Sequence, residues 1–145
     1  MAPTCYLPAL GMVNALGEDL AGISAGLFSG DTRGMVTETG WLPGRSARVG
    51  RARMAELPAL PAGLAARDSR NNRLLLAALA QIRAELHAAI ARFGAHRIGV
   101  VLGTSTSSIV EGEAAIAHHA RHSALPEGFH YGRQELGDCA RFAAD

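Results

Sequence analysis

Residues 97–113, RIGVVLGTSTSSIVEGE, constrain the fold of this chain more than any other stretch of its sequence. An unbroken apolar run at 98–102 leads into the hydroxyl-rich segment 103–108. Such a run is typical of a central parallel strand that helices cover on both faces. Open α/β sheets bind ligands just beyond the carboxyl ends of their strands. We therefore expect a strand at 98–102 and a ligand-facing loop after it.

The rest of the sequence predicts alternating helices and strands, which is the pattern of the α/β class with right-handed crossovers. Apolar residues recur at helical spacing over 18–29 and over a single long stretch, 69–93. Ser108 and Glu111 have the spacing of a capping box, which predicts a further helix over 109–122.

Other segments carry weaker signals. Residues 4–16 are expected to form the first strand, and a last helix is expected over 134–145. Residues 31–66 contain many glycines and prolines, so we interpret them as an irregular surface excursion within one domain, 1–145. A short strand over 46–54 is the regular element expected there.

The composition excludes several classes of function. The chain is 48% hydrophobic and 19% charged with a net charge of +1, so it offers no electrostatic case for binding nucleic acid or an anionic membrane. All 14 basic residues are arginines, which excludes Schiff-base chemistry by a lysine of this chain. The loose arginine group over 45–53 favours a solvated basic strand or loop over a phosphate patch. Two cysteines and no stretch of transmembrane length predict a cytoplasmic protein.

Neither cysteine is in a setting that favours catalysis. Cys139 follows Asp138 in a predicted helix, and a neighbouring carboxylate disfavours the thiolate, so Cys139 is interpreted as a small buried hydrophobe. Cys5 is expected in the core as part of the first strand. His118 and His122 are one helical turn apart and form a candidate zinc pair, but no third ligand is evident. Imidazoles that complement the end of a helix dipole are the favoured interpretation.

The hydroxyl-rich segment supplies the candidate binding residues, Thr104, Ser105, Thr106 and Ser107. Their hydroxyls and backbone amides are suited to lining a narrow pocket or orienting a thioester. A polar turn whose last serine caps the next helix is the competing interpretation. The segment lacks the lysine of a P-loop and the glycine spacing of a nucleophile elbow, so neither phosphate cradling nor serine hydrolysis is predicted.

Three stretches resemble one family. The opening LPALGMVNALG, the line SRNNRLLLAALAQI and the line RIGVVLGTSTSS resemble, in this order and spacing, the amino-terminal part of β-ketoacyl-acyl carrier protein synthases. These ketosynthases are condensing enzymes of the thiolase-like superfamily. The resemblance implies an α-β-α-β-α sandwich built from two similar halves, usually in a homodimer. This chain would supply the amino-terminal half, incomplete.

The resemblance implies decarboxylative Claisen condensation of an acyl thioester with malonyl-carrier protein, in fatty acid, polyene or polyketide synthesis. The implied partner is an acyl carrier protein, and no metal or redox cofactor is implied. In the family the nucleophilic cysteine follows the next strand, and two histidines and a lysine come later, all past Asp145. The resemblance therefore assigns this chain no catalytic residue and gives residues 104–107 a substrate-binding role.

Three hypotheses follow for the chain. In the first, it is the amino-terminal part of an acyltransferase and is inactive alone. The reading frame then continues past Asp145 into a strand and a cysteine at the start of a helix. In the second, it is a natural noncatalytic half-domain that binds a full-length synthase or a carrier protein. A zinc-dependent protein that uses the histidines is a third. Uncovered apolar surface on the long helix and at 98–102 predicts a homodimer or higher assembly.

Overall fold

The computed structural model describes residues 4–104 and 106–145, which form two compact units. Each unit is built from two stretches of the chain. The first unit comprises Met1–Glu56 and Ala77–Arg92, and the second comprises Leu57–Leu76 and Phe93–Asp145.

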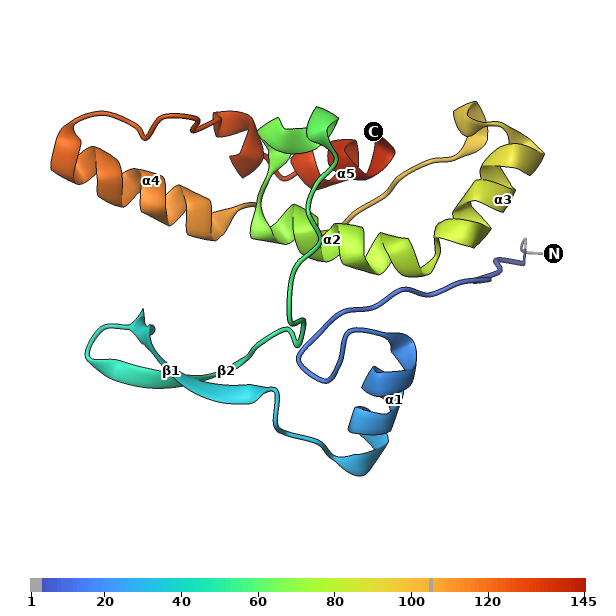
Figure 1. The fold of residues 1–145 in the computed structure, drawn as a ribbon, viewed down its shortest axis with the longest axis horizontal. Coiled ribbons are helices and arrows are strands. Elements are labelled where there is room, and N and C mark those ends of the chain that lie inside the picture. The colour runs from blue at the N-terminus through green and yellow to red at the C-terminus, as the bar shows by residue number, and fades with distance from the viewer. Residues whose placement is uncertain (1–3, 105) are drawn as a thin grey trace. The chain divides into compact units, whose positions relative to one another are not determined.

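The regular elements are mainly helices, and the described residues include one two-stranded sheet (Figure 1). The α-helices are α1 (Leu20–Ser29), α2 (Arg70–Gln81), α3 (Arg83–Phe93), α4 (Ile109–His122) and α5 (Asp138–Ala144). The strands are β1 (Met35–Leu42) and β2 (Arg45–Gly50), and the 3₁₀ turns are η1 (Ala62–Arg67), η2 (Ala95–Arg97) and η3 (Tyr131–Gln134). The expected mixture of α and β structure is confirmed, but this sheet is antiparallel and not the parallel sheet that the sequence predicted.

Helix α1 confirms the helix predicted over 18–29. The Asp19 carboxylate accepts a hydrogen bond from the Gly22 N–H at 2.7 Å, which satisfies one of the free amides of the first turn. The helix ends at Gly30, whose φ of 68° is a left-handed conformation that glycine adopts without a steric cost. Ile23 and Gly26 form its buried face.

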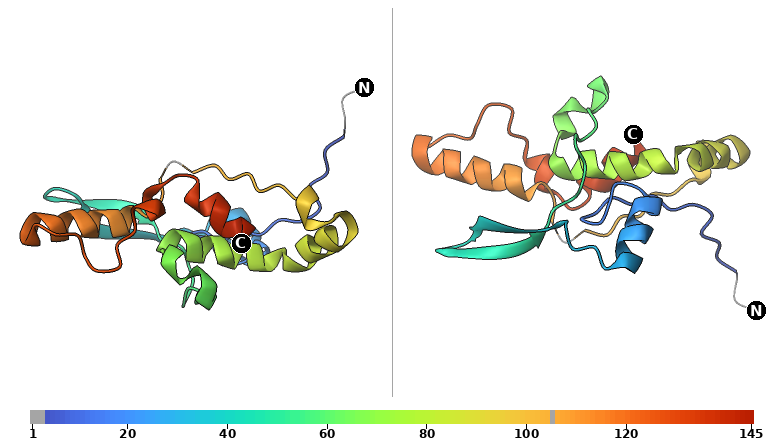
Figure 2. Two further views of the ribbon diagram at one scale, coloured as in Figure 1. Left: turned by 90° about the horizontal axis from the view of Figure 1, so that it is seen from above. Right: turned by 60° about the horizontal axis from the view of Figure 1, so that its bottom comes forward.

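The hairpin β1–β2 lies inside the stretch for which irregular structure was predicted. Val36 pairs with Val49 and Glu38 with Ala47, and the two further views show a twisted ribbon (Figure 2). The predicted strand over 46–54 is therefore shorter than expected, and its partner β1 was not predicted. The reason is that most of β1 is exposed, so it lacks the apolar alternation that marks a half-buried strand.

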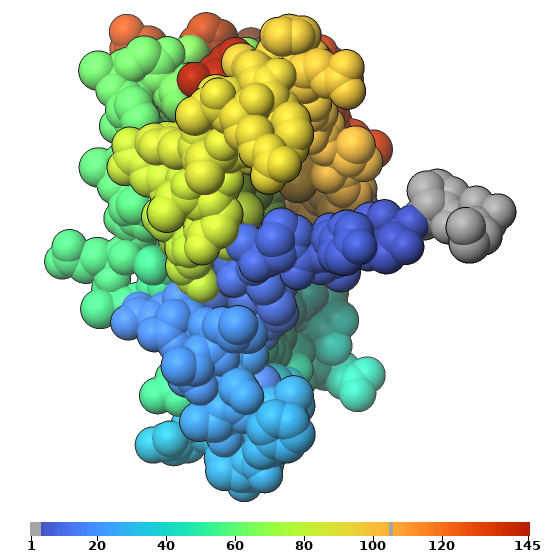
Figure 3. All heavy atoms as spheres, turned by 90° about the vertical axis from the view of Figure 1, so that its right-hand side faces the viewer, coloured from blue at the N-terminus to red at the C-terminus, as the bar shows by residue number. Residues whose placement is uncertain are grey.

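The first strand predicted over 4–16 is absent from the structure. Instead, the Gln81 side-chain amide makes two hydrogen bonds with the backbone of Met12. It accepts from the Met12 N–H at 3.1 Å and donates to the Met12 carbonyl at 3.0 Å. The first half of the segment, residues 4–10, is mostly exposed (Figure 3), whereas residues 11–16 are half-buried. Cys5 is exposed, contrary to the predicted core position. Extended backbone becomes a strand only beside a partner strand, and here its partner is a helix side chain.

The long helix predicted over 69–93 is broken at Ile82. Helices α2 and α3 meet there at an angle of 73°. The Ile82 N–H bonds the Leu79 carbonyl three residues back at 3.1 Å, where an unbroken α-helix would use Ala78. A methyl group added at Gly11 would overlap the Ala78 carbonyl oxygen, so the amino-terminal segment approaches the helix at this carbonyl. Interruption of the hydrogen-bond ladder is a recognised cause of kinks, and here the Gly11 backbone lies beside the carbonyl that an unbroken ladder would use.

No single helix of the described residues is long and apolar enough to cross a membrane. The bent pair α2 and α3 would suffice together, by length and composition only.

The strand predicted over 98–102 is also absent. Val101 is 94% exposed, and among the described residues no second strand pairs with this segment. An apolar run is typical of a buried strand. Burial of a parallel strand, however, requires neighbours on both edges and both faces.

Helix α4 begins at Ile109 and ends at His122, as predicted, but the predicted capping box is wrong. The Ser108 side chain makes no capping hydrogen bond. Glu111 accepts from the Arg70 N–H at 3.1 Å instead, so it stabilises the first turn of α2. The last helix, α5, is shorter than the predicted 134–145 because a 3₁₀ turn, η3, occupies the start of that range.

Candidate functional site

The candidate binding segment closes on itself at its amino-terminal side. The Thr104 hydroxyl donates to the Thr106 carbonyl at 2.5 Å, and the Thr106 N–H donates back to Thr104 Oγ1 at 3.3 Å. Thr104 is half-buried and Thr106 is exposed. Ser105, which also belongs to the predicted binding set, lies outside the described residues. The Thr104 hydroxyl is thus occupied by hydrogen bonds within the loop.

Ser107 anchors the other side of the loop in the interior of the second unit. Its side chain is buried, and its hydroxyl donates to the Arg133 carbonyl at 2.7 Å. The same oxygen lies 3.8 Å from the Cys139 sulfur. Because this buried hydroxyl already has a hydrogen-bond partner, its role is structural: Ser107 holds the end of the loop against the interior of the unit.

Ser108 carries the local strain of the site. Its φ of 47° and ψ of 42° are left-handed, which is uncommon for a residue with a side chain. The buried Ser108 hydroxyl has no hydrogen-bond partner, whereas its carbonyl accepts from Gln134 Nε2 at 3.0 Å. Both features cost free energy, so the surrounding contacts hold this turn against its local preference.

A small cleft of about 150 Å³ lies beside the loop. Its walls come from the first turns of α2 and α4 and from the loop, namely Arg70, Asn71, Leu74, Thr106, Ser108, Ile109, Val110 and Glu111. Thr106 is therefore the described member of the predicted set that faces an open space. The cleft has one basic and one acidic side chain, with three apolar side chains between them.

A polar cluster lies behind the loop, around Asn72, which is only 1% exposed. The Asn72 amide nitrogen donates to the Arg67 carbonyl at 2.9 Å and to Asp138 Oδ2 at 3.2 Å. Asp138 is also buried, and its other oxygen lies 3.8 Å from Arg67 Nε. Burial of a carboxylate is tolerated here because a guanidinium and an amide face it.

Ser69 and Asp68 also stabilise the start of α2. Ser69 Oγ accepts from the Asn72 N–H at 3.2 Å and so caps the helix. Asp68 is held by Arg73 through two hydrogen bonds of 2.6 Å. These hydrogen bonds lower the pKa of Asp68, and the Asp68 carboxylate raises the pKa of Arg73.

Cys139 has the structural role that the sequence predicted. It is 3% exposed, and Asn71 Nδ2 donates to its sulfur at 2.9 Å. The sequence reasoning did not single out Asn71 or Asn72. Two consecutive asparagines just inside a helix were the available signal, because asparagine is unfavourable there unless its amide has a partner.

The histidine pair lies at the carboxyl end of α4. The rings of His118 and His122 have centroids 4.5 Å apart, and His118 Nδ1 is 2.9 Å from the Ala124 carbonyl oxygen. Across residues 4–104 and 106–145, no group of three or more His, Cys, Asp or Glu side chains is close enough to hold a metal ion.

Comparison with known proteins agrees with the resemblance of the three sequence stretches to ketosynthases. No family model matches the chain, and no curated protein does. A solved structure does match: the ketosynthase ApeO in complex with its chain length factor ApeC, from Xenorhabdus doucetiae. The matched chain of that complex is 45% identical, and the superposition has a TM-score of 0.87.

The match covers 96% of this chain and 35% of the other, so this chain spans about a third of the length of its relative. The chain is therefore ketosynthase-like along nearly all of its length, as predicted from its sequence.

Proposed function

We propose that this chain is the amino-terminal part of a ketosynthase whose full-length form catalyses decarboxylative Claisen condensation. In that reaction an acyl group passes from a carrier-protein thiol to a cysteine. A malonyl thioester then loses carbon dioxide, and its α-carbon attacks the acyl carbonyl carbon and displaces the cysteine sulfur. The proposal rests on the 45% identity over 96% of the chain. It extends to an acyl carrier protein as partner, in fatty acid, polyene or polyketide synthesis.

The fold proposed for the full-length protein is the thiolase-like sandwich. Residues 4–16 and 98–102 would become strands within it, once neighbouring strands pair with their backbones. The exposure of Val101 and Leu7 supports this proposal, because extended apolar segments are stable when a sheet covers them.

In this proposal residues 104–107 line the acyl pocket. Thr106 is the described residue that supports it best, because it faces the cleft between the first turns of α2 and α4. Ser107 would act by holding the loop, since its hydroxyl is already bonded to Arg133.

The chain alone is proposed to be inactive in acyl transfer. A nucleophilic cysteine needs access to its thioester and a positive environment. Cys139 is buried beneath Asn71 and Ser107, and Cys5 lies in a segment without regular structure.

Intact-mass measurement tests this directly. The chain is incubated with an acyl-acyl carrier protein, and no stoichiometric acyl adduct is expected. Cys5→Ser and Cys139→Ser variants locate any adduct that forms. An adduct that disappears only in Cys139→Ser would overturn the claim of inactivity, whereas one that disappears in Cys5→Ser would indicate transfer to an exposed thiol.

A noncatalytic role is the second candidate, supported by the fact that the solved relative is a complex of a ketosynthase with a chain length factor. In this case the chain binds a synthase or a carrier protein and performs no condensation. Mixing it with purified ApeO, ApeC or an acyl carrier protein, followed by size-exclusion chromatography with light scattering, tests this role. A defined complex would favour it, and no complex with any of the three would contradict it.

Self-association is proposed from the exposed apolar side chains of α4 and of the segment 98–102. Ile116 on α4 is 72% exposed, and in the apolar segment 98–102 Val101 is almost fully exposed. Apolar surface of this kind generally marks an interface. Light scattering of the chain alone should give a homodimer or larger species, and a monomer at high micromolar concentration would contradict the proposal.

A further inference from the structure

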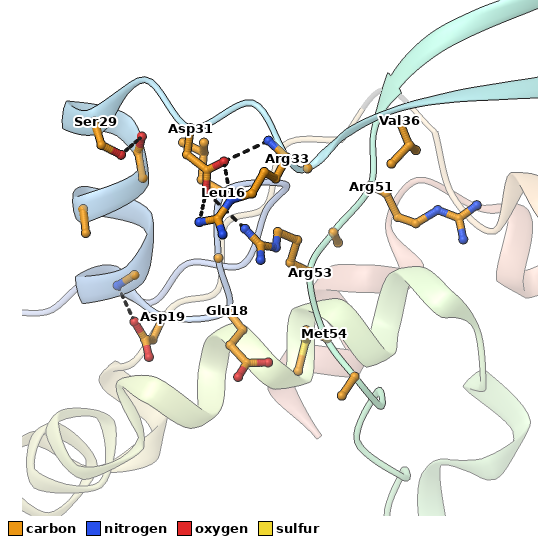
Figure 4. Close-up of a pocket in the computed structure, with 17 residues that line it drawn as sticks. Leu16, Glu18, Asp19, Ser29, Asp31, Arg33, Val36, Arg51, Arg53 and Met54 are labelled. Carbon is orange, nitrogen blue, oxygen red and sulfur yellow. Dashed lines mark hydrogen bonds and ion pairs between the residues drawn. The ribbon is translucent and has the colours of Figure 1, made fainter.

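The first unit has a wide, open cavity of about 930 Å³ on its surface that the proposed function does not use (Figure 4). Cavities of this size accommodate small organic ligands. Its lining residues are Leu16, Gly17, Glu18, Asp19, Gly22, Ala25, Gly26, Ser29, Asp31, Arg33, Gly34, Val36 and the segment 51–55.

One wall of the cavity is a face of α1 that carries almost no side-chain volume. Gly22, Ala25, Gly26 and Ser29 recur there at steps of three, one and three, so they lie on one side of the helix. A ligand can approach the helix backbone closely at such a face. Leu16, Val36 and Met54 add apolar surface to the lining, so the cavity is suited to an apolar ligand body.

Three arginines, Arg33, Arg51 and Arg53, also line the cavity. Asp31 binds two of them: its oxygens accept from Arg33 Nε at 2.9 Å and Arg33 Nη2 at 2.8 Å, and Arg53 Nη1 lies 3.3 Å away. One carboxylate thus faces two guanidinium groups, which leaves this three-residue cluster with a net positive charge. Figure 4 shows Asp31, Arg33 and Arg53 gathered together beside α1.

Asp31 is well placed to hold these arginines permanently. Its side chain is only 9% exposed, and hydrogen bonds from Arg33 keep its pKa far below the usual range of a carboxyl. Arg53 contacts Asp31 through Nη1 only, so its Nε and Nη2 keep their donor capacity for a ligand. Asp31 therefore orients the basic group without neutralising it.

The hairpin and the segment after it are mainly basic. Residues 32–53 contain five arginines and a single carboxylate, Glu38, in a chain whose net charge is +1. Glu38 is itself occupied by Arg51 and by the Trp41 indole N–H. Glu18 and Asp19 also line the cavity, so its full lining carries three arginines and three carboxylates. Figure 4 shows Glu18 and Asp19 away from Arg33, so the two signs of charge are separated and an anion is favoured at the Arg33 end.

We propose that this cavity binds a small amphipathic anion, with its carboxylate or phosphate on Arg33 and Arg53 and its apolar body along the small-residue face of α1. This also revises the interpretation of the arginine group at 45–53: Arg51 and Arg53 line a binding site, while Arg48 lies on the hairpin outside it.

Calorimetric titration of the 145-residue chain with hexyl phosphate tests the proposal. Inorganic phosphate and hexanol are the two separated halves of that probe, and hexanoate replaces its phosphate with a carboxylate. Hexyl phosphate or hexanoate should bind more tightly than inorganic phosphate or hexanol, and the stronger of the two identifies the anionic group. If neither amphipathic anion binds more tightly than both halves, the proposal is wrong.

Matched variants locate the site. Arg53→Gln should weaken binding of the stronger probe at least about tenfold, because it removes charge-assisted hydrogen bonds. Arg48→Gln removes the same charge outside the cavity and should leave the affinity unchanged. Ala25→Leu should weaken binding by filling the α1 wall, while Ala21→Leu, which is on α1 but outside the lining, should not.

Thermal unfolding of each variant confirms that it is folded. Equal losses in Arg53→Gln and Arg48→Gln would show general charge attraction and overturn the site. Full affinity in a folded Ala25→Leu variant would overturn the placement of the apolar body.

Discussion

The two compact units differ in where they keep their polar side chains. In the second unit Asn72, Asp138 and Ser107 are buried, and their partners belong to the same interior. In the first unit the arginines of the ion pairs are open to solvent: the side chains of Arg33 and Arg51 are 78% and 65% exposed. Buried polar groups are costly to leave unpaired, whereas exposed pairs contribute little to stability. The first unit's arginines are therefore accessible to the proposed ligand, although each is paired with a carboxylate, and the second unit's polar groups stabilise the fold.

Asp138→Ala should produce the largest loss of stability. It leaves Arg67 and Asn72 without their buried partner, and we expect a loss of about 3 kcal/mol in the free energy of unfolding. Urea denaturation measures it. Glu135→Ala removes an exposed ion pair with Arg141 in the same unit and should cost under about 1 kcal/mol. Similar losses in both variants would remove the contrast between buried and exposed groups.

Gly34→Ala tests whether close backbone packing stabilises the first unit. An added methyl would overlap the Ala15 carbonyl oxygen, so we expect a loss of about 2 kcal/mol from overpacking. Gly63→Ala is the matched control, because nothing lies within 4 Å of a methyl group added there. Thermal and urea unfolding of both variants provide the comparison, and equal stability of the two would contradict the packing at Gly34.

Ser107→Ala should cost about 1 kcal/mol, because the Arg133 carbonyl loses its hydrogen-bond donor in the interior. Thr106→Ala, one residue earlier and exposed, should change the free energy of unfolding by less than about 0.5 kcal/mol. Urea denaturation distinguishes the two. A larger loss for Thr106→Ala would show that the outer part of the loop, and not Ser107, fixes its position.

The smallest effect concerns the acid stability of the first unit. The folded pKa of Asp31 is lowered by Arg33, so its contribution to stability is present above the unfolded pKa of about 4 and is lost as the pH falls below it. Asp31→Asn should lower the melting temperature most above about pH 5, and the difference from the wild-type protein should shrink towards pH 2. A difference that is constant with pH would show that the carboxylate charge is not responsible.

Sequence reasoning succeeded where the determining contacts are local. Asp19, Gly30 and the apolar spacing between them define α1 within a few residues of chain, and α4 was found with its observed bounds. The predicted burial of Cys139 is also confirmed. The hydroxyl-rich loop was recognised from its composition, but its buried supports Asn71 and Asn72 were missed because their partners are more than 60 residues away.

The sequence by itself determined the extents of α1 and α4, the charge pattern and the ketosynthase-like order of segments, since each of these depends on residues close together in the chain. Only the tertiary structure decided which extended segments pair, where the long helix breaks at Ile82, and that Glu111 stabilises α2 instead of its own helix. Strand pairing and helix kinks depend on backbone groups that meet across large sequence separations. The apolar run at 98–102 shows the difference: its sequence specifies extended, apolar backbone, but a strand forms only when another strand lies beside it.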